Sequence, residues 1–175
     1  MEEKMICRRA EITDLPEIME IIDNAKVFMR VFDMDQWQNG YPNEEVFRRD
    51  IILKECYVAI CDNETAGVMV VTPVLEECYK EIEGQGWLTD SEPYMTIHRM
   101  AVAEKYRGTK VAEEMISFAE NLCMKKGRKS LRTDTHKKNL AMQRFLEKQG
   151  FSYCGVVDYK DTAGDTLRIA YEKIN

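Results

Sequence analysis

The chain has 175 residues, of which 45% are hydrophobic, enough for one core of ordinary size with little left for a second domain. Its net charge of −6 argues against non-specific binding to the phosphate backbone of nucleic acids. We therefore predict a single domain over residues 1–175 without a nucleic-acid partner. The acidic balance would suit a cationic substrate such as an amine, and at least as well a surface charged only for solubility.

Nothing in the sequence indicates export or membrane insertion. Residues 1–5 contain three charged side chains and no apolar segment, so no secretory signal is predicted. No stretch approaches the ~20 apolar residues of a membrane span. The six cysteines are scattered without a Cys-x-x-Cys pair, and only His98 and His136 could add nitrogen ligands, which predicts neither a metal site nor a disulfide framework. We expect a cytoplasmic protein that binds no metal and no membrane.

The first half of the chain predicts a strand, two helices and a β-hairpin. The helices are indicated by apolar residues at spacings of three and four and by start signals at Asp14 and Asn43. Between them, residues 33–41 combine turn formers with large aromatic side chains and predict an irregular loop. The predicted elements are a strand over 5–9, helices from 14 to about 32 and from 44 to about 54, and hairpin strands over 56–61 and 67–74.

The second half alternates strands and helices. A polar stretch over 76–92 could hold a short helix and ends at Pro93. The widest apolar helical face of the sequence follows the strand after it. The predicted elements are a strand over 94–102, a helix from 109 to about 127, a strand over 130–134, a helix over 139–148, and strands over 152–159 and 166–172 that pair across a turn at 161–164.

The segment from Tyr94 to Ala112 runs from a strand through a sharp turn at Arg107 and Gly108 into the start of a helix. Free backbone N–H groups and the helix dipole make such a turn a site for phosphate oxygens, and Arg107 and Lys110 add positive charge. The same pattern also occurs as a mere connection. On this ground alone, phosphate binding and a plain connection are equally good interpretations.

Two motifs in this order resemble a known family. Ala101-Val102-x-x-x-Tyr106-Arg107-Gly108 before a helix resembles motif A of the GCN5-related N-acetyltransferases (GNAT), and residues 139–151, which end in Glu-Lys-Gln-Gly-Phe, look like that family's second signature. The order of elements is also similar across nearly the whole chain. The resemblance implies an α/β (α+β) fold with a mixed, mostly antiparallel central sheet and helices on both faces.

The resemblance further implies acetyl transfer from acetyl-CoA to a primary amine of a small molecule or peptide, by direct attack and without a covalent enzyme intermediate. A catalytically silent module that binds acyl-CoA is the alternative, and a homodimer is left open. The implied cofactor residues are Arg107, Gly108, Thr109, Lys110, Val111 and Ala112 for the pyrophosphate, Met100, Ala101 and Val102 for the thioester carbonyl, and Asn139, Met142 and Phe145 beside the pantetheine.

The chain departs from the family pattern at two positions. Lys110 stands where the inner glycine of the loop is expected, so its side chain would either crowd a phosphate or reach it with its ammonium group. Leu146 stands where many members carry a tyrosine that protonates the leaving thiolate. A thiol has a pKa of about 8.5, so transfer does not require that acid, and Tyr153 is a nearby candidate for the role.

His98 is the candidate base that accepts the proton of the attacking amine, whose pKa is near 10 in solution. By two-residue alternation we expect it to face the same side of its strand as Met100 and Val102. A histidine tethered by a hydrogen bond in a polar cleft is the alternative interpretation, and Thr96 and Asp134 are weaker candidates for the base.

We expect the amine pocket to be formed by long irregular segments, because these carry specificity on such scaffolds. The candidate lining residues are Trp37 and Tyr41 in one loop and Trp87 in another. Asp33, Asp35 and Glu44 could bind a cation there, although helix capping and loop solvation are the better explanation for any one of them.

Overall fold

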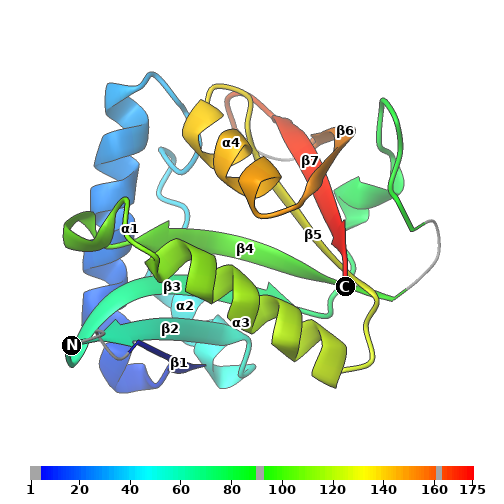
Figure 1. The fold of residues 1–175 in the computed structure, drawn as a ribbon. Coiled ribbons are helices and arrows are strands. Elements are labelled where there is room, and N and C mark those ends of the chain that lie inside the picture. The colour runs from blue at the N-terminus through cyan, green and yellow to red at the C-terminus, as the bar shows by residue number, and fades with distance from the viewer. Residues whose placement is uncertain (1–4, 90–92, 161–162) are drawn as a thin grey trace.

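The computed structural model describes residues 5–89, 93–160 and 163–175. In these residues, one seven-stranded sheet has the order β1-β2-β3-β4-β5-β7-β6, with helices on both faces (Figure 1). Among the described strand pairs, only β4 and β5 run parallel, which confirms the predicted mixed, mostly antiparallel sheet. The strands are β1 Ile6–Arg9, β2 Cys56–Cys61, β3 Glu64–Thr72, β4 Tyr94–Val102, β5 Ser130–His136, β6 Ser152–Asp158 and β7 Leu167–Ile174, and the helices are α1 Leu15–Val31, α2 Glu44–Ile52, α3 Val111–Lys125 and α4 Leu140–Lys148.

Local sequence signals explain where the helices begin. Asn43 caps α2 because its side chain accepts a hydrogen bond from the amide of Val46 at 3.0 Å. Asn139 does the same for α4, accepting from the amide of Met142 at 3.1 Å. Pro16 occupies the first turn of α1, where its missing N–H costs nothing.

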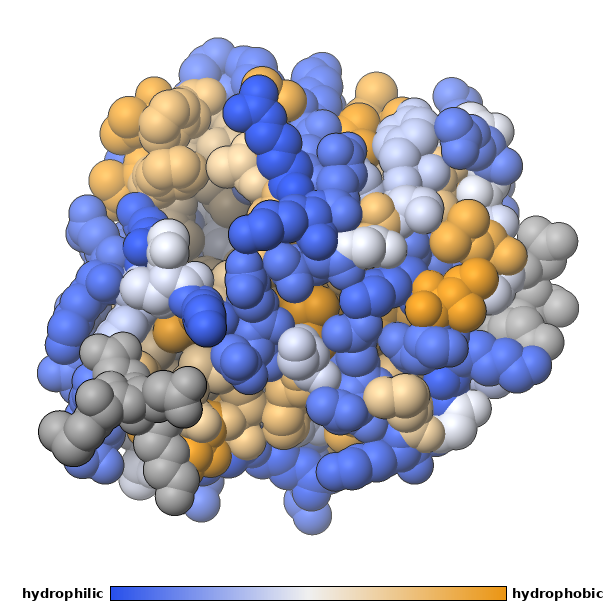
Figure 2. Space-filling model, viewed as in Figure 1, coloured by the Kyte–Doolittle hydropathy of each residue, from blue (hydrophilic) through white to orange (hydrophobic). Residues whose placement is uncertain are grey.

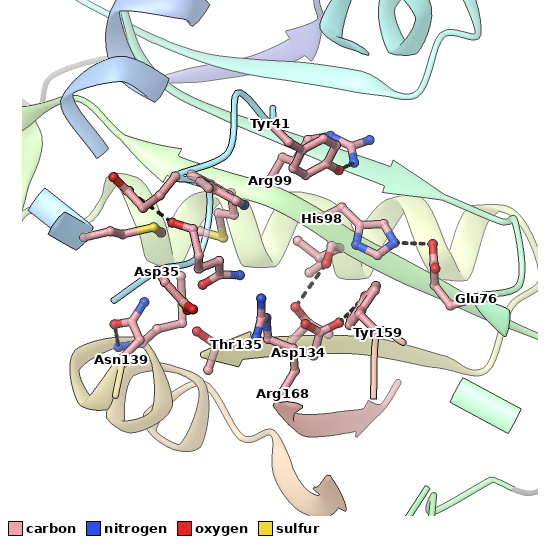
Figure 3. A pocket seen from close by; sticks show the side chains of 18 of the residues that line it. Asp35, Tyr41, Glu76, His98, Arg99, Asp134, Thr135, Asn139, Tyr159 and Arg168 are labelled. Atoms are coloured by element: carbon pink, nitrogen blue, oxygen red, sulfur yellow. Dashed lines mark hydrogen bonds and ion pairs between the residues drawn. The ribbon is translucent and has the colours of Figure 1, made fainter. Parts of the chain in front are cut away.

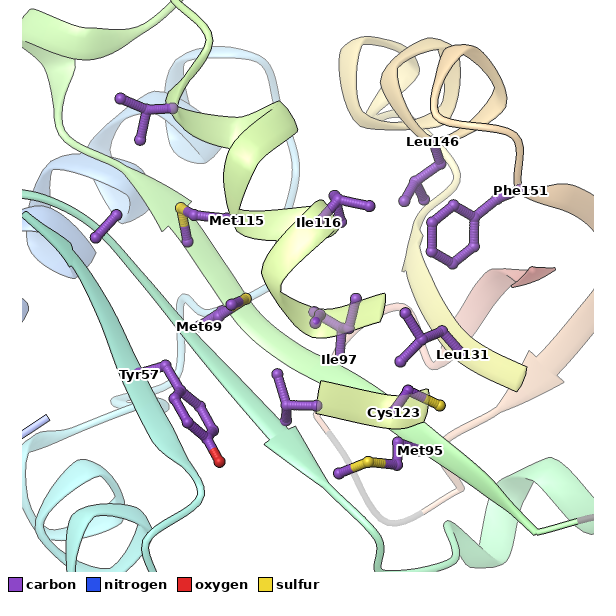
Figure 4. Close-up of a cluster of buried hydrophobic side chains, with 14 of the residues drawn as sticks. Tyr57, Met69, Met95, Ile97, Met115, Ile116, Cys123, Leu131, Leu146 and Phe151 are labelled. Carbon is purple, nitrogen blue, oxygen red and sulfur yellow. The ribbon is translucent and has the colours of Figure 1, made fainter. Parts of the chain in front are cut away.

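The sheet separates two apolar cores, as the alternation along its strands requires. In β3, Met69 and Val71 face the core beneath α3 and α4, while Val68 and Val70 face the core beneath α1 and α2. Figure 4 shows the first of these cores. Each fully buried large side chain stabilises the fold by about 1.5–3 kcal/mol, so both faces depend on their helices.

The two central strands, β4 and β5, pair over a short stretch and then diverge. β4 and β5 pair over only three positions, Tyr94–Thr96 with Ser130–Arg132. At the fork, Thr133 Oγ1 donates to the carbonyl of Ile97 at 3.0 Å. Beyond it the two strands diverge, leaving an opening in the middle of the sheet. That opening positions the candidate site.

The predicted order of strands and helices is confirmed, with shifts at several ends. The predicted strand 67–74 begins earlier and ends at Thr72, and the predicted strand 130–134 continues to His136. The polar stretch 76–92 contains a short 3₁₀ helix, Glu77–Lys80. Part of the predicted turn at 161–164 lies outside the described residues.

Hydrophilic residues dominate the face seen in Figure 2, with hydrophobic residues gathered over the end of α1. This patch includes the exposed residues Val27, Val31 and Phe32. None of the described helices combines the length and the apolar composition that crossing a bilayer requires.

Candidate active site

A cavity of about 550 Å³ lies at the opening between β4 and β5 (Figure 3). Its walls come from the loop 35–41, the bulged part of β4, residues 133–135 of β5, the first turns of α4, and Arg168 of β7. Among the residues predicted for function, Trp37, Tyr41, His98, Met100, Asn139 and Met142 line it. Segments far apart in the sequence therefore meet around one space.

The turn before α3 has the features of an anion site. Gly108 adopts φ +76°, a left-handed conformation that glycine adopts without strain. Thr109 Oγ1 accepts a hydrogen bond from the amide of Val111 at 3.4 Å. No described residue accepts from the amides of Ala112 and Glu113 in the same turn, so these amides are left for another acceptor. Arg107 lies at this turn, with its guanidinium carbon 5.1 Å from the ring centre of Phe28. Lys110 has ordinary helical angles, so a side chain at that position causes no backbone strain.

The divergence of the strands leaves one edge of β4 open. From His98 to Val102 this edge has no ladder partner on β5 among the described residues. Asn139, Met142 and Leu146 of α4 line the cavity opposite, whereas Phe145 packs into the core beneath α3. An open peptide edge facing an apolar helix surface fits an extended chain such as the acyl-pantetheine of CoA, which carries both amide and apolar groups.

His98 lines the cavity, but the expected alternation along β4 is wrong. A β-bulge interrupts the pairing with β3, and Arg99 in the bulge has φ +50°. His98 pairs with Val70 and shares its side of the sheet, whereas Met100 and Val102 pack against the core beneath α3. The extra residue in the bulge reverses the direction of the side chains that follow it.

Glu76 accompanies His98. Its Oε1 lies 2.9 Å from Nε2 of His98, at an angle outside the range of a hydrogen bond. Contact with His98 lowers the pKa of Glu76, against the burial that would raise it, so the carboxylate stays ionised at neutral pH. In Figure 3, Glu76 lies on one side of the imidazole and the cavity on the other. The imidazole thus has one side held and one side free to meet a ligand.

Asp134 of β5 forms a second polar centre in the cavity. Its Oδ2 accepts hydrogen bonds from the phenols of Tyr79 and Tyr159, both at 2.7 Å. Burial, followed by the charge of Asp134, raises the pKa of both phenols well above the ordinary value of tyrosine. The two tyrosines therefore remain hydrogen-bond donors to this carboxylate at any physiological pH.

The loop 35–41 is held at both ends by charged contacts. Arg99 donates from Nη1 to the hydroxyl of Tyr41 at 2.6 Å and from Nη2 to the buried carboxylate of Asp50 at 2.8 Å. At the other end, Asp35 lies 3.0 Å from Nε2 of His136. Burial, and next the charge of a nearby arginine, lowers the pKa of His136, so the imidazole is neutral at neutral pH. These contacts place Trp37 and Tyr41 against the cavity.

Two predicted site residues lie elsewhere. The guanidinium carbon of Arg132 lies 4.2 Å from the centre of the Trp87 ring. The indole Nε1 of Trp87 donates to the carbonyl of Tyr79 at 2.8 Å. It contributes to a small core rather than to the cavity. Tyr153 is 40% exposed, outside the cavity, and meets the ring of Tyr171 edge-on. Neither side chain reaches the candidate site.

The acidic residues predicted for cation binding have protein partners instead. Asp33 pairs with Lys138, and Glu44 pairs with Arg48 one helical turn away. The charged residues that sequence analysis left out of the site are Glu76, Arg99 and Arg168, together with the phenol of Tyr159. None carries a local signal, because each reaches the cavity only through the packing of distant segments.

Comparisons with known proteins agree on the fold and the family. The model of the Acetyltransferase (GNAT) family matches residues 26–151. A GNAT family acetyltransferase from Streptococcus agalactiae is 34% identical, with a TM-score of 0.85 over 98% of this chain and 95% of that one. The comparison with curated protein sequences gives no significant match.

More distant structures share the fold. A putative acetyltransferase from Staphylococcus aureus is 24% identical, with a TM-score of 0.72 over 97% of this chain and 98% of that one. The PaiA N-acetyltransferase of Thermoplasma acidophilum, solved in complex with coenzyme A, is 17% identical, with a TM-score of 0.73 over 98% of this chain and 99% of that one.

Proposed function

The chain belongs to the GNAT acetyltransferase family, and on that premise we propose that it transfers the acetyl group of acetyl-CoA to a primary amine of a small molecule or peptide. The observation that carries this proposal is the cavity between the diverging strands β4 and β5, which has an open peptide edge and the imidazole of His98 in its wall. It offers room for an acyl chain and a group that can accept a proton.

Acetyl-CoA brings an acyl group already activated as a thioester. Residues 107–112 would hold its pyrophosphate with the free amides of the first turn of α3 and the charges of Arg107 and Lys110. The open edge of β4 at 100–102 would donate to the thioester carbonyl. Asn139 and Met142 would flank the pantetheine from α4.

The transfer moves one acyl group and two protons, because the acceptor arrives as an ammonium ion. His98 accepts the first proton before attack and releases it to solvent. The amine nitrogen then forms a bond to the thioester carbon, the carbon–sulfur bond breaks, and the second proton of the nitrogen passes through solvent to the leaving thiolate, giving an amide and free CoA. Nε2 of His98 lies beside Glu76, so Nδ1, on the other side of the ring, is the nitrogen that would accept the proton.

The substitution His98→Ala tests this assignment. We expect turnover at neutral pH to fall by about 10²–10⁴-fold, with acetyl-CoA affinity unchanged by calorimetry because His98 lies away from the turn before α3. The lost rate should return as pH approaches the amine pKa, since the amine then arrives deprotonated. In the milder variant Glu76→Gln the imidazole stays in place, so a smaller loss is expected.

A chain that binds acetyl-CoA and releases no free CoA with any amine would instead be a silent acyl-CoA-binding module. The buried Leu146, 2% exposed where the family acid is expected, is the feature that favours this second candidate. Free CoA release across a panel of amines separates the two functions.

A further inference from the structure

One carboxylate oxygen of Asp134 accepts hydrogen bonds from the protein, and the other accepts none from the described residues. Tyr79 and Tyr159 both donate to Oδ2, and no described residue donates to Oδ1. The side chain lines the cavity on the same side as His98 and Glu76 (Figure 3). A carboxylate fixed by two phenols and open on its other oxygen is a ready acceptor for a charged N–H group.

The two arginines around the cavity have protein partners. Arg99 is held by Tyr41 and Asp50. Arg168, on β7, donates from Nη1 to the carbonyls of Asp165 and Leu167.

The remaining carboxylates in the wall have partners as well. Asp35 uses one oxygen for His136 and the other for the amide of Asp165 at 2.6 Å. Glu76 contacts His98 and adds a second negative charge at the end of the cavity where Asp134 lies.

We propose that Asp134 is a specificity-determining residue, which binds a second, positively charged nitrogen of the acceptor while the first nitrogen is acetylated beside His98. This inference rests on the proposed function and narrows its substrate class to diamines and other amines with a second cationic group. Such a nitrogen is protonated at neutral pH, because free alkyl amines have pKa values of about 10.

Three acceptors with the same four-carbon chain test the anchor: butylamine, 1,4-diaminobutane and 4-aminobutyrate. They differ only in a far end that is neutral, cationic or anionic. With the wild-type protein, we expect kcat/KM for the diamine to exceed that for butylamine by about tenfold or more, as for one charge-assisted hydrogen bond. The anionic acceptor should be the poorest.

The variant Asp134→Asn should lower kcat/KM for the diamine by about tenfold or more, so that the ratio of the diamine to butylamine falls towards one. Asp62→Asn, which removes an exposed carboxylate from the β2–β3 turn, controls for the change in net charge. Acetyl-CoA affinity and the thermal unfolding midpoint show whether each variant is folded. The acceptor series with the wild-type protein tests the anchor even if a variant does not fold.

The possible failures are distinguishable. No acetylation of any amine would refute the proposed function. Acetylation of butylamine and the diamine at equal rates, or a preference for 4-aminobutyrate that would point to Arg168, would refute the anchor alone. An equal loss with both amines in Asp134→Asn would also refute it, because Asp134 would then serve the chemical step.

Discussion

Gly155 provides the most stringent test of how the segment 77–89 is held against the sheet. This glycine lies in β6 with φ +145°, where side chains are strongly disfavoured. A Cβ atom at this position would lie 2.1 Å from the carbonyl oxygen of Glu83. Since that oxygen belongs to the backbone, the substitution Gly155→Ala must push the whole segment away from β6.

The cost follows from the contacts that hold the segment. Glu83 and Val156 exchange two backbone hydrogen bonds of 2.9 and 2.7 Å, and the amide of Gly86 donates to Cys154 at 2.9 Å. Each contributes about 0.5–1.5 kcal/mol, and the backbone conformation adds about 1–3 kcal/mol of strain for alanine. We expect Gly155→Ala to lower the free energy of unfolding by about 3–7 kcal/mol, a large share of the ~5–15 kcal/mol typical of a domain.

Gly86→Ala is the matched control. Gly86 also has positive φ, +85°, but no heavy atom lies within 4 Å of the added Cβ, so only the ~1–2 kcal/mol of left-handed strain applies. Urea unfolding of both variants measures the difference, with far-UV circular dichroism as a probe of the helices. Fluorescence adds a local probe, because Trp87 is in the segment. A Gly155→Ala variant no less stable than Gly86→Ala would refute the reasoning.

Two further predictions concern the anion site and the buried charge at the end of the sheet. Arg107→Ala should weaken acetyl-CoA binding about tenfold or more, while Lys126→Ala at the other end of α3 should leave it unchanged; calorimetry showing equal affinity for Arg107→Ala and wild type would contradict the site. Burial raises the pKa of Glu172, but hydrogen bonds from Ser130, Thr89 and Arg132 outweigh it and the pKa is lowered. Its stabilisation is therefore present above the ordinary pKa of about 4.3 and lost as pH falls toward the folded value. Glu172→Gln should cost about 3–5 kcal/mol at neutral pH and flatten the pH dependence of urea midpoints below about pH 5, and an unchanged acid profile would count against this account.

Local sequence patterns were sufficient for the elements of this fold. Apolar spacing of three and four specified α1 and α3, and Asn43 and Asn139 marked helix starts that their capping hydrogen bonds confirm. The turn at Gly108 could also be predicted, because a positive φ just before a helix favours glycine. These features depend on residues within a few positions of one another, so a single sequence carries them.

The direction of His98 depended on pairing between strands. Alternation along β4 predicts the side of each residue only if the strand is regular, and the bulge at Arg99 breaks that rule. The neighbouring residues do not predict the bulge, because the bulge arises from the pairing of β4 with β3. Trp87 was misplaced for a related reason, since its ring is held by Arg132 from a distant strand.

The polar centre of the cavity was decided by tertiary structure alone. Asp134 receives hydrogen bonds from Tyr79, 55 residues before it, and from Tyr159, 25 residues after it. The sequence by itself determined the strands and helices, the turn at Gly108 and the family resemblance, because all of these depend on short-range patterns. The tertiary structure alone decides which side chains line the cavity, through the divergence of β4 and β5 and the packing of the flanking loops. The reason is that burial and long-range hydrogen bonds act between segments that no local pattern connects.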